Sequence, residues 1–275
     1  MTKHTLLYFF IFINIVFAQS SSLFSSNQKK EVIINLLNSH LEVNQNTEFI
    51  VGVKFTLKED WHTYWKNPGD SGLPPKFEWD LPPGIEAGEI NFPIPEMINF
   101  DDMVNYSYSQ TVIFPVKFKI NKKYEGLQQA KVKISWLVCK EICLAQDTII
   151  NFNIKFGNEK PNIDLKILNR IIQNSSIKLN NYADVKSIIF RKNSLELRFK
   201  TEITDVESII FYPSEYGQYN HSSTQNYKIT KDEIFISVPL DQYASEKPKS
   251  IDGLIILKTK NKTYNLNINS PIGIQ

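Results

Sequence analysis

Residues 132–143 read VKISWLVCKEIC. Apolar side chains occupy every second position from Val132 to Val138, which is the pattern of a β-strand with one buried face. The strand leads directly into Cys139 and Cys143, the two cysteines of the chain. The stretch therefore predicts a strand that carries a close cysteine pair into a turn.

The same alternation recurs elsewhere in the chain. It covers residues 32–36, 49–55 and 112–118 before the cysteine pair, and residues 149–156 after it. Several short strands separated by turn residues are typical of an antiparallel β-sandwich. We therefore expect an all-β protein.

Residues 61–95 have a different composition, rich in proline, glycine and aromatic residues. Such a composition favours ordered loops and edge strands over helices. Within it, residues 61–75 are expected to build core and rigid turns rather than a partner surface. His62 is expected as a surface or hydrogen-bonded strand residue, and Asp70 as a turn former.

Leucine and isoleucine recur at helical spacing between residues 162 and 174, with Asn162 as a plausible N-cap. This predicts one short amphipathic helix, after which strand patterns resume. We expect three parts: a β-sandwich over residues 31–157, a helical linker over 158–180, and a second, smaller β domain over 181–275.

The N-terminus has the features of a secretory signal peptide over residues 1–18. A weakly basic start is followed by an apolar run over residues 6–17, and Ala18 is a small residue at the expected cleavage point. Residues 19–30 are then expected to form a flexible leader. The apolar run is short for a membrane span, so an uncleaved membrane anchor is the less favoured alternative to cleavage. No later stretch is long and apolar enough to cross a membrane. The sequence thus predicts an exported, periplasmic and soluble mature protein.

Charge patterning argues against a nucleic-acid partner. The chain has 31 lysines and arginines against 29 acidic residues, for a net charge of +2. Lysines are interspersed with acids, so no concentrated basic field is expected. The sequence also lacks a glycine-rich phosphate loop, a zinc-peptidase motif and a hydrolase elbow, and we expect no cofactor.

Three interpretations of Cys139 and Cys143 remain open from the residues alone. A structural disulfide suits an exported protein, but so small a ring stabilises little. Two thiolates can bind Cu(I), although no histidine or methionine lies near the pair in sequence. A redox-active dithiol can attack a partner disulfide and then resolve the mixed disulfide internally. Lys140 would stabilise a thiolate here and Glu141 would oppose it.

The spacing of the pair excludes one scaffold. Thioredoxin-like domains place two residues between their cysteines, at the start of a helix in a βαβ unit. Here three residues intervene on a β framework, and no helical pattern follows. Any redox role must therefore rest on a different fold.

Two separated blocks resemble a known family. Residues 61–75 read WHTYWKNPGDSGLPP, Trp79 follows, and residues 136–143 read WLVCKEIC. In this order they resemble the N-terminal periplasmic domain of the DsbD family of thiol:disulfide interchange proteins, and most of all its ScsB-like branch (suppressor of copper sensitivity). The resemblance covers about residues 30–157. Residues 211–213 resemble more loosely the second β domain of ScsB-like proteins.

The resemblance implies an immunoglobulin-like β-sandwich in which Cys139 and Cys143 form a reversible disulfide. Such a pair accepts electrons from a transmembrane domain and a thioredoxin-like domain, and then reduces periplasmic disulfide proteins. The chain would therefore be a thiol–disulfide oxidoreductase of the relay type. Which cysteine attacks first does not follow from the spacing.

The resemblance also implies a cap loop that shields the cysteines until a partner docks. In DsbD members this loop precedes a strand with a Leu-Pro-Val-like segment, which FPV at residues 114–116 matches. The candidate cap is therefore Phe100, Asp101, Asp102 and Met103.

DsbD and ScsB proteins continue into a multi-helix membrane domain and a thioredoxin-like domain, and this sequence shows neither. We expect a thioredoxin-like periplasmic protein as partner and a separate membrane electron donor of the DsbD/ScsB transmembrane type. The alternative is a periplasmic copper-handling or protein-interaction module, in which Cys139 and Cys143 bind Cu(I) or form a structural disulfide.

Overall fold

The structure of the chain is a computed structural model. It describes residues 31–45, 48–100, 102–175, 177–231, 233–244 and 248–273. Within these ranges most residues lie in β-strands, and the ladders between named strands are antiparallel. The all-β fold class expected from the alternation is therefore confirmed. The predicted signal peptide, 1–18, and leader, 19–30, lie outside the described residues.

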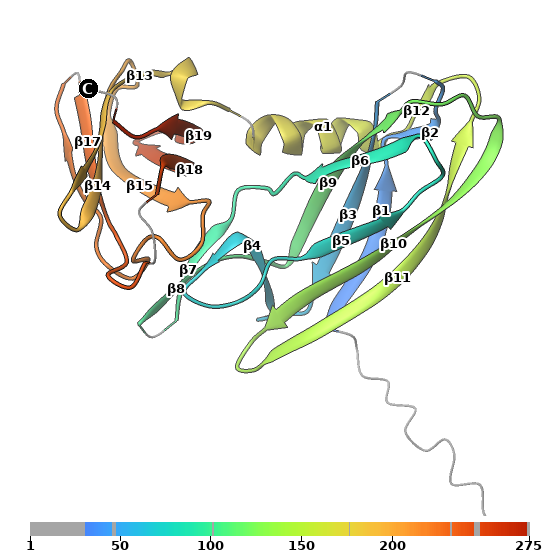
Figure 1. Ribbon diagram of the computed structural model, residues 1–275, viewed down its shortest axis with the longest axis horizontal. Coiled ribbons are helices and arrows are strands. Elements are labelled where there is room, and N and C mark those ends of the chain that lie inside the picture. Colours follow the sequence, from blue (N-terminus) through green and yellow to red (C-terminus); the bar gives the residue numbers. More distant parts are fainter. Residues whose placement is uncertain are drawn as a thin grey trace, which may run out of the picture. The chain divides into compact units, whose positions relative to one another are not determined.

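The N-terminal sandwich consists of two sheets with a core between them (Figure 1). In the first sheet the order is β1 (Val32–Asn38), β3 (Phe49–Leu57), β9 (Thr111–Ile120) and β6 (Ile85–Ile90). In the second it is β11 (Cys143–Phe156), β10 (Gly126–Cys139), β4 (His62–Gly69), β8 (Met103–Ser109) and β7 (Glu96–Phe100), with β5 (Lys76–Asp80) paired to β10. The short strands β2 (His40–Glu42) and β12 (Lys160–Pro161) pair with each other.

Aromatic rings from both sheets meet in this core. The Phe55 ring of β3 lies edge-on to Phe114 of β9 at 5.3 Å and to Trp136 of β10 at 5.5 Å. Phe55 and Phe114 are fully buried and Trp136 is nearly so. Edge-to-face pairs contribute about 0.5–1.5 kcal/mol beyond the area that they bury. The alternating apolar side chains that precede the cysteines in β10 thus face this core.

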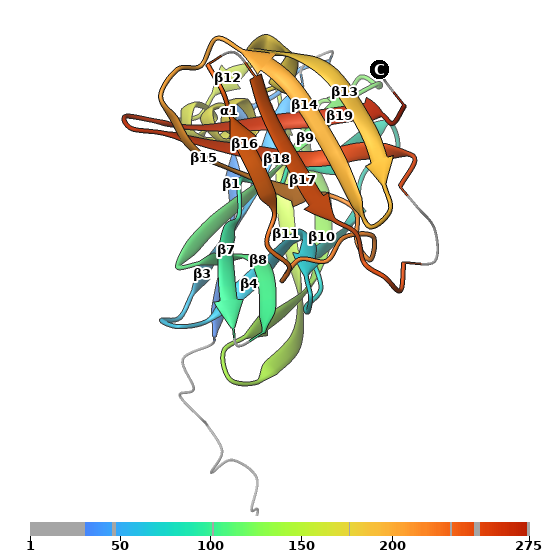
Figure 2. The same cartoon turned by 90° about the vertical axis from the view of Figure 1, so that its left-hand side faces the viewer.

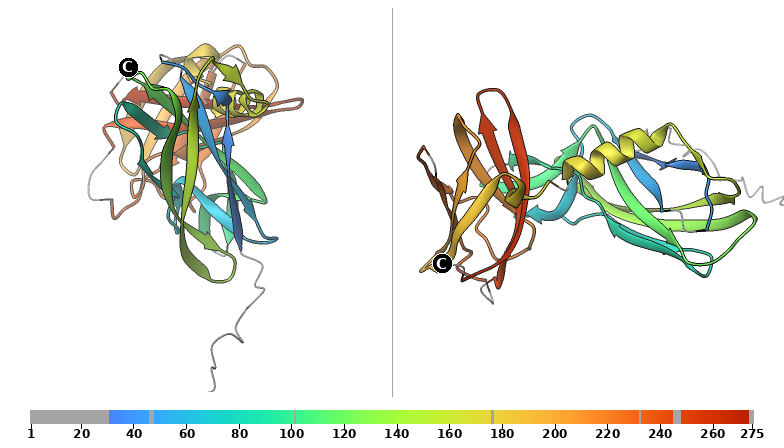
Figure 3. Two further views of the ribbon diagram at one scale, coloured as in Figure 1. Left: turned by 90° about the vertical axis from the view of Figure 1, so that its right-hand side faces the viewer. Right: turned by 90° about the horizontal axis from the view of Figure 1, so that it is seen from above.

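One helix packs against the first sheet. Helix α1 (Asp164–Ser175) lies along the sheet in Figure 3, and its Leu168 is buried against Ile50 and Ile113. Gly52 of β3 permits this approach, because a Cβ at that position would lie 2.4 Å from Leu168 Cδ2. A short 3₁₀ helix, η1 (Leu179–Asn181), follows the helix.

Two further sheets form the C-terminal sandwich. One has the order β13 (Ala183–Arg191), β14 (Ser194–Thr201), β17 (Glu233–Pro239) and β16 (Asn226–Ile229), which lie side by side in Figure 2. The other has the order β15 (Val206–Pro213), β18 (Ser250–Thr259) and β19 (Thr263–Pro271). Side chains from both sheets, among them Leu197 and Leu257, share one buried cluster.

The two sandwiches contact each other through β4 and β8. The side-chain amide of Asn67 donates hydrogen bonds to the carbonyl oxygens of Pro213 and Glu215, at 2.9 and 2.8 Å. Tyr106 of β8 lies against Tyr212 of β15, with ring centroids 4.7 Å apart. Residues 31–275 group into one compact unit. Separate folding of the second sandwich stays a prediction.

The composition of residues 61–95 favoured loops and edge strands, but β4 is an interior strand. It lies inside its sheet, between β10 and β8. Pro68 is accommodated because the register of β4 on β8 shifts between Tyr64 and Gly69. Proline lacks the N–H that a regular ladder would use, so such an irregularity allows it within an interior strand.

Candidate functional site

The cysteine pair lies at the tip of the β10–β11 hairpin (Figure 1). Cys139 ends β10, Cys143 begins β11, and a disulfide joins them. The two residues face each other in the ladder, with Cα atoms 4.1 Å apart. Residues 140–142 connect them, with a hydrogen bond of 3.1 Å from the Lys140 N–H to the Ile142 carbonyl. The long hairpin ladder therefore brings the sulfur atoms together.

The two cysteines differ in exposure. Cys139 is 2% exposed, whereas Cys143 is exposed to solvent. The difference follows from the sheet order, because β10 lies between β11 and β4 while β11 is an edge strand. Cys139 also pairs across the ladder with His62. Cys143 is therefore open to solvent at the hairpin tip, whereas Cys139 is covered by the sheet.

The charges beside the disulfide are arranged as an ion pair. Lys140 Nζ lies 2.8 Å from Asp60 Oδ2. That hydrogen bond raises the pKa of Lys140, and the charge of Asp60 adds to the effect. The lysine between the cysteines is therefore already paired with a carboxylate, which weakens its expected role as a thiolate stabiliser.

Strand β4 places two aromatic side chains beside the disulfide. The Tyr64 hydroxyl lies 4.0 Å from Cys143 Sγ, and the Tyr64 residue is 1% exposed. Burial raises the pKa of Tyr64. The His62 ring lies edge-on to Tyr64 at 5.3 Å, and burial lowers the pKa of His62. A phenol O–H and a neutral imidazole therefore border the sulfur atoms at neutral pH.

Residues of the 61–75 block hold Tyr64 in place. A Cβ at Gly72, whose φ is +107°, would lie 2.3 Å from Tyr64 Cε1. The Asn105 side chain hydrogen-bonds Tyr64 and lowers its pKa, and it exchanges hydrogen bonds of 3.0 and 3.2 Å with Ser71 Oγ. The block is largely structural, as expected, yet its tyrosine reaches the disulfide.

The candidate cap residues lie at the β7–β8 turn. Phe100 ends β7 and Met103 begins β8, and both are exposed, as is Asp102. Asp101 lies outside the described residues. The end of β8 nearest to the cysteines is Ser109, which pairs with His62. That end is six residues from Met103, roughly 20 Å along a strand. A shielding role for this turn stays a prediction.

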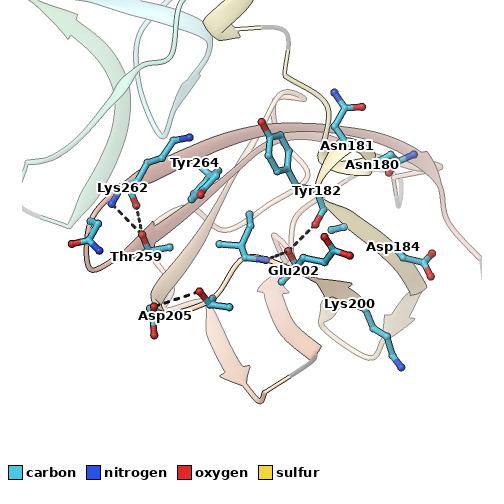
Figure 4. A pocket seen from close by; sticks show the side chains of 15 residues that line it. Asn180, Asn181, Tyr182, Asp184, Lys200, Glu202, Asp205, Thr259, Lys262 and Tyr264 are labelled. Carbon is cyan, nitrogen blue, oxygen red and sulfur yellow. Dashed lines mark hydrogen bonds between the residues drawn. The ribbon is translucent and has the colours of Figure 1, made fainter.

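A hollow of about 1100 Å³ lies in the C-terminal sandwich (Figure 4). Polar side chains line much of it, and Lys262 Nζ lies 4.3 Å from the centre of the Tyr264 ring. Its lining belongs to residues 180–264 and contains no cysteine. The hollow is therefore separate from the thiol chemistry.

The described part of the chain has neither a cluster of metal ligands nor a helix of membrane-spanning character. There, no group of three or more histidine, cysteine, aspartate or glutamate side chains is arranged to hold a metal ion. The Cu(I) alternative needs only the two thiolates and stays a prediction. None of the helices in the same residues has the length and apolar character that a membrane span requires.

Sequence reasoning missed Tyr64 and Asp60 as neighbours of the cysteines. A partial signal existed, because His62 and Tyr64 are two residues apart and so share one face of a strand. The pairing of β4 with β10 at Cys139 could not be read from the sequence. Only that pairing places the shared face beside the disulfide.

Comparison with known proteins gives two findings. Residues 37–153 match the sequence model of the family described as "Thiol:disulfide interchange protein DsbD, N-terminal". The fold is similar to the crystal structure of the N-terminal periplasmic domain of ScsB from Proteus mirabilis, with a TM-score of 0.67 and 16% sequence identity. That similarity covers 90% of this chain and 96% of the other. Comparison with curated proteins gives no match.

The matched segment contains both cysteines, all of β10, most of β11, and the strand that carries Tyr64. The structural similarity extends beyond this segment, because it covers 90% of the chain. Residues 37–153 therefore match the DsbD N-terminal domain family, and the chain has the fold of the ScsB N-terminal periplasmic domain.

Proposed function

We propose that this protein exchanges disulfides with thioredoxin-like proteins in the periplasm, using Cys139 and Cys143 as a reversible dithiol. The observation that carries the proposal is the unequal exposure of the two cysteines at a hairpin tip, within a segment that matches the DsbD N-terminal domain family. An exposed sulfur can meet a partner, and a buried neighbour within bonding distance can resolve the mixed disulfide.

In the reducing direction, the Cys143 thiolate attacks one sulfur of a partner disulfide. A bond forms between Cys143 Sγ and that sulfur, and the other partner sulfur leaves as a thiolate. The Cys139 thiolate then attacks Cys143 Sγ, which restores the Cys139–Cys143 disulfide and releases the first partner sulfur. Two electrons pass from this chain to the partner. The reverse sequence, with a reduced thioredoxin-like donor, reloads the dithiol.

The family assignment supports the choice of partners. The matching family is described as thiol:disulfide interchange, and the similar structure is a periplasmic domain. We therefore propose a thioredoxin-like protein as the direct partner, supplied with electrons by a membrane protein of the DsbD/ScsB transmembrane type.

Two serine variants test the proposal and serve as controls for each other. The Cys139→Ser protein lacks the resolving sulfur, so it should accumulate a mixed disulfide with an oxidised thioredoxin-like protein. The Cys143→Ser protein should form little adduct, because Cys139 is buried. Non-reducing electrophoresis and mass spectrometry measure both. If neither the Cys139→Ser nor the Cys143→Ser protein forms an adduct, the exchange function is refuted.

The reduction potential separates a relay from an inert crosslink. Structural disulfides of exported proteins usually lie below about −300 mV, whereas exchangeable ones lie higher. We expect Cys139–Cys143 to lie above that value in equilibrium with glutathione or dithiothreitol. A lower potential would favour a structural role.

A further inference from the structure

The Tyr64 hydroxyl takes no part in the exchange steps, yet it lies beside the sulfur of Cys143. It is 4.0 Å from Cys143 Sγ, at the end of a buried ring. A disulfide sulfur has no hydrogen, so the hydroxyl is the donor in this contact. A buried phenol that points at a redox sulfur is a feature that packing alone does not require, because phenylalanine would fill the same space.

We propose that Tyr64 is a positioning residue that donates a hydrogen bond to the Cys143 thiolate and thereby lowers the pKa of that thiol. This inference rests on the proposed function, because it concerns the reduced form of the same pair. It assigns the attacking role to Cys143 on electrostatic grounds, in addition to exposure. A hydrogen bond to an ionised acceptor stabilises that form and is stronger than a neutral one.

Neighbouring side chains hold the Tyr64 phenol beside Cys143. A side-chain hydrogen bond with Asn105 lowers the pKa of Tyr64, against the effect of burial. Ser71 in turn exchanges hydrogen bonds with Asn105. Gly72 leaves the space that the ring needs.

The other groups around the hairpin tip are less able to stabilise a thiolate. Lys140 is paired with Asp60 at 2.8 Å. His62 lies against the Tyr64 ring, and burial lowers its pKa, so its imidazole is neutral at pH 7. Glu141 is exposed and would oppose a second negative charge. The Tyr64 hydroxyl is therefore the donor best placed to act.

The effect has a defined size and a pH signature. Losing a hydrogen bond to a charged acceptor should change the ionisation constant of Cys143 roughly ten- to hundredfold, which raises its pKa by about one to two units. Nucleophilicity grows with pKa, with a Brønsted slope of about 0.4–0.5. At a pH below the pKa of Cys143 in both proteins, Tyr64→Phe should therefore react about three- to sixteenfold more slowly. Above the pKa of both proteins it should react about 2.5- to tenfold faster.

The experiment measures Cys143 alone. In a Cys139→Ser background of the full chain, a small aromatic disulfide is mixed with the protein between pH 6 and pH 11, and release of its chromophore gives the rate. Tyr64→Phe removes the hydroxyl and keeps the ring. Gly72→Ala keeps the hydroxyl but displaces the ring, and it should shift the pKa in the same direction. Tyr219→Phe is the control, because the buried Tyr219 hydroxyl has no hydrogen-bond partner among the described residues.

The expected result is a raised pKa of Cys143 in Tyr64→Phe and Gly72→Ala, with rate profiles that cross that of the parent, and no shift in Tyr219→Phe. A structural defect would change rates at all pH values in one direction and would not produce the crossing. An unchanged pKa in a folded Tyr64→Phe protein overturns the inference. The assay needs no protein partner, so failure of the partner-trapping test would refute the exchange function without deciding the role of Tyr64.

Discussion

Reduction of the Cys139–Cys143 disulfide should leave the protein folded and cost little stability. The crosslink closes a loop of only five residues, from Cys139 to Cys143. The chain-entropy relation for disulfides gives about 2 kcal/mol at 25 °C for so short a loop. Folded proteins have stabilities of roughly 5–15 kcal/mol, so this loss is tolerable.

The structure explains why the hairpin survives without the crosslink. Strand β10 pairs with β11 along its whole length and also with β5 on its other side. Its inward side chains, among them Val132 and Ile134, are fully buried in the core. None of these interactions uses the sulfur atoms. The cysteines therefore sit at the end of a hairpin that forms without them.

The assay is urea unfolding at pH 7, followed by tryptophan fluorescence, with and without a phosphine reductant. We expect a loss of about 2 kcal/mol on reduction, with an unchanged denaturant slope. A protein carrying both Cys139→Ser and Cys143→Ser is the control, and its transition should not respond to the reductant. A loss of 4 kcal/mol or more, or unfolding without urea, would show that the disulfide is a structural staple and would contradict the relay.

Two further predictions concern the contact between the sandwiches. Asn67→Ala removes the two hydrogen bonds to the carbonyls of Pro213 and Glu215, and it should lower the free energy of unfolding by about 2–3 kcal/mol. The control is Asn151→Ala at an exposed position, which should change the free energy of unfolding by less than about 0.5 kcal/mol. The His221 ring lies 5.4 Å from the Tyr106 ring of β8, in this contact. Burial lowers the pKa of His221, so the unfolded chain binds its proton first as the pH falls. The free energy of unfolding should therefore decrease as the pH falls from about 7 to the pKa of His221 in the folded protein. In urea titrations at several pH values, His221→Gln should make the free energy of unfolding depend less on pH. An unchanged pH dependence would contradict the lowered pKa of His221.

The strands with clear alternation were predictable from the sequence. Residues 49–55 and 112–118 lie within β3 and β9, and residues 132–138 within β10. Their inward residues are buried, because a period of two directs alternate side chains to one face of a sheet. Helix α1 was also predictable, since its apolar residues recur at helical spacing.

Strand β4 was less predictable. Its sequence, HTYWKNPG, contains a proline and a terminal glycine, which indicate a loop or an edge. It nevertheless lies between two strands, because the ladder shifts where the proline falls. Local propensity could not reveal that β4 is an interior strand, because an interior position depends on which other strands pair with it on each side.

The sequence by itself determined the fold class, the close cysteine pair and the family resemblance, because alternation and short motifs are local properties of the chain. The tertiary structure decided that Cys139 is buried and Cys143 exposed, and that Tyr64 and the Lys140–Asp60 pair border the sulfurs. These features depend on the order of strands in a sheet. That order brings together residues more than seventy positions apart, and no local pattern in the sequence encodes it.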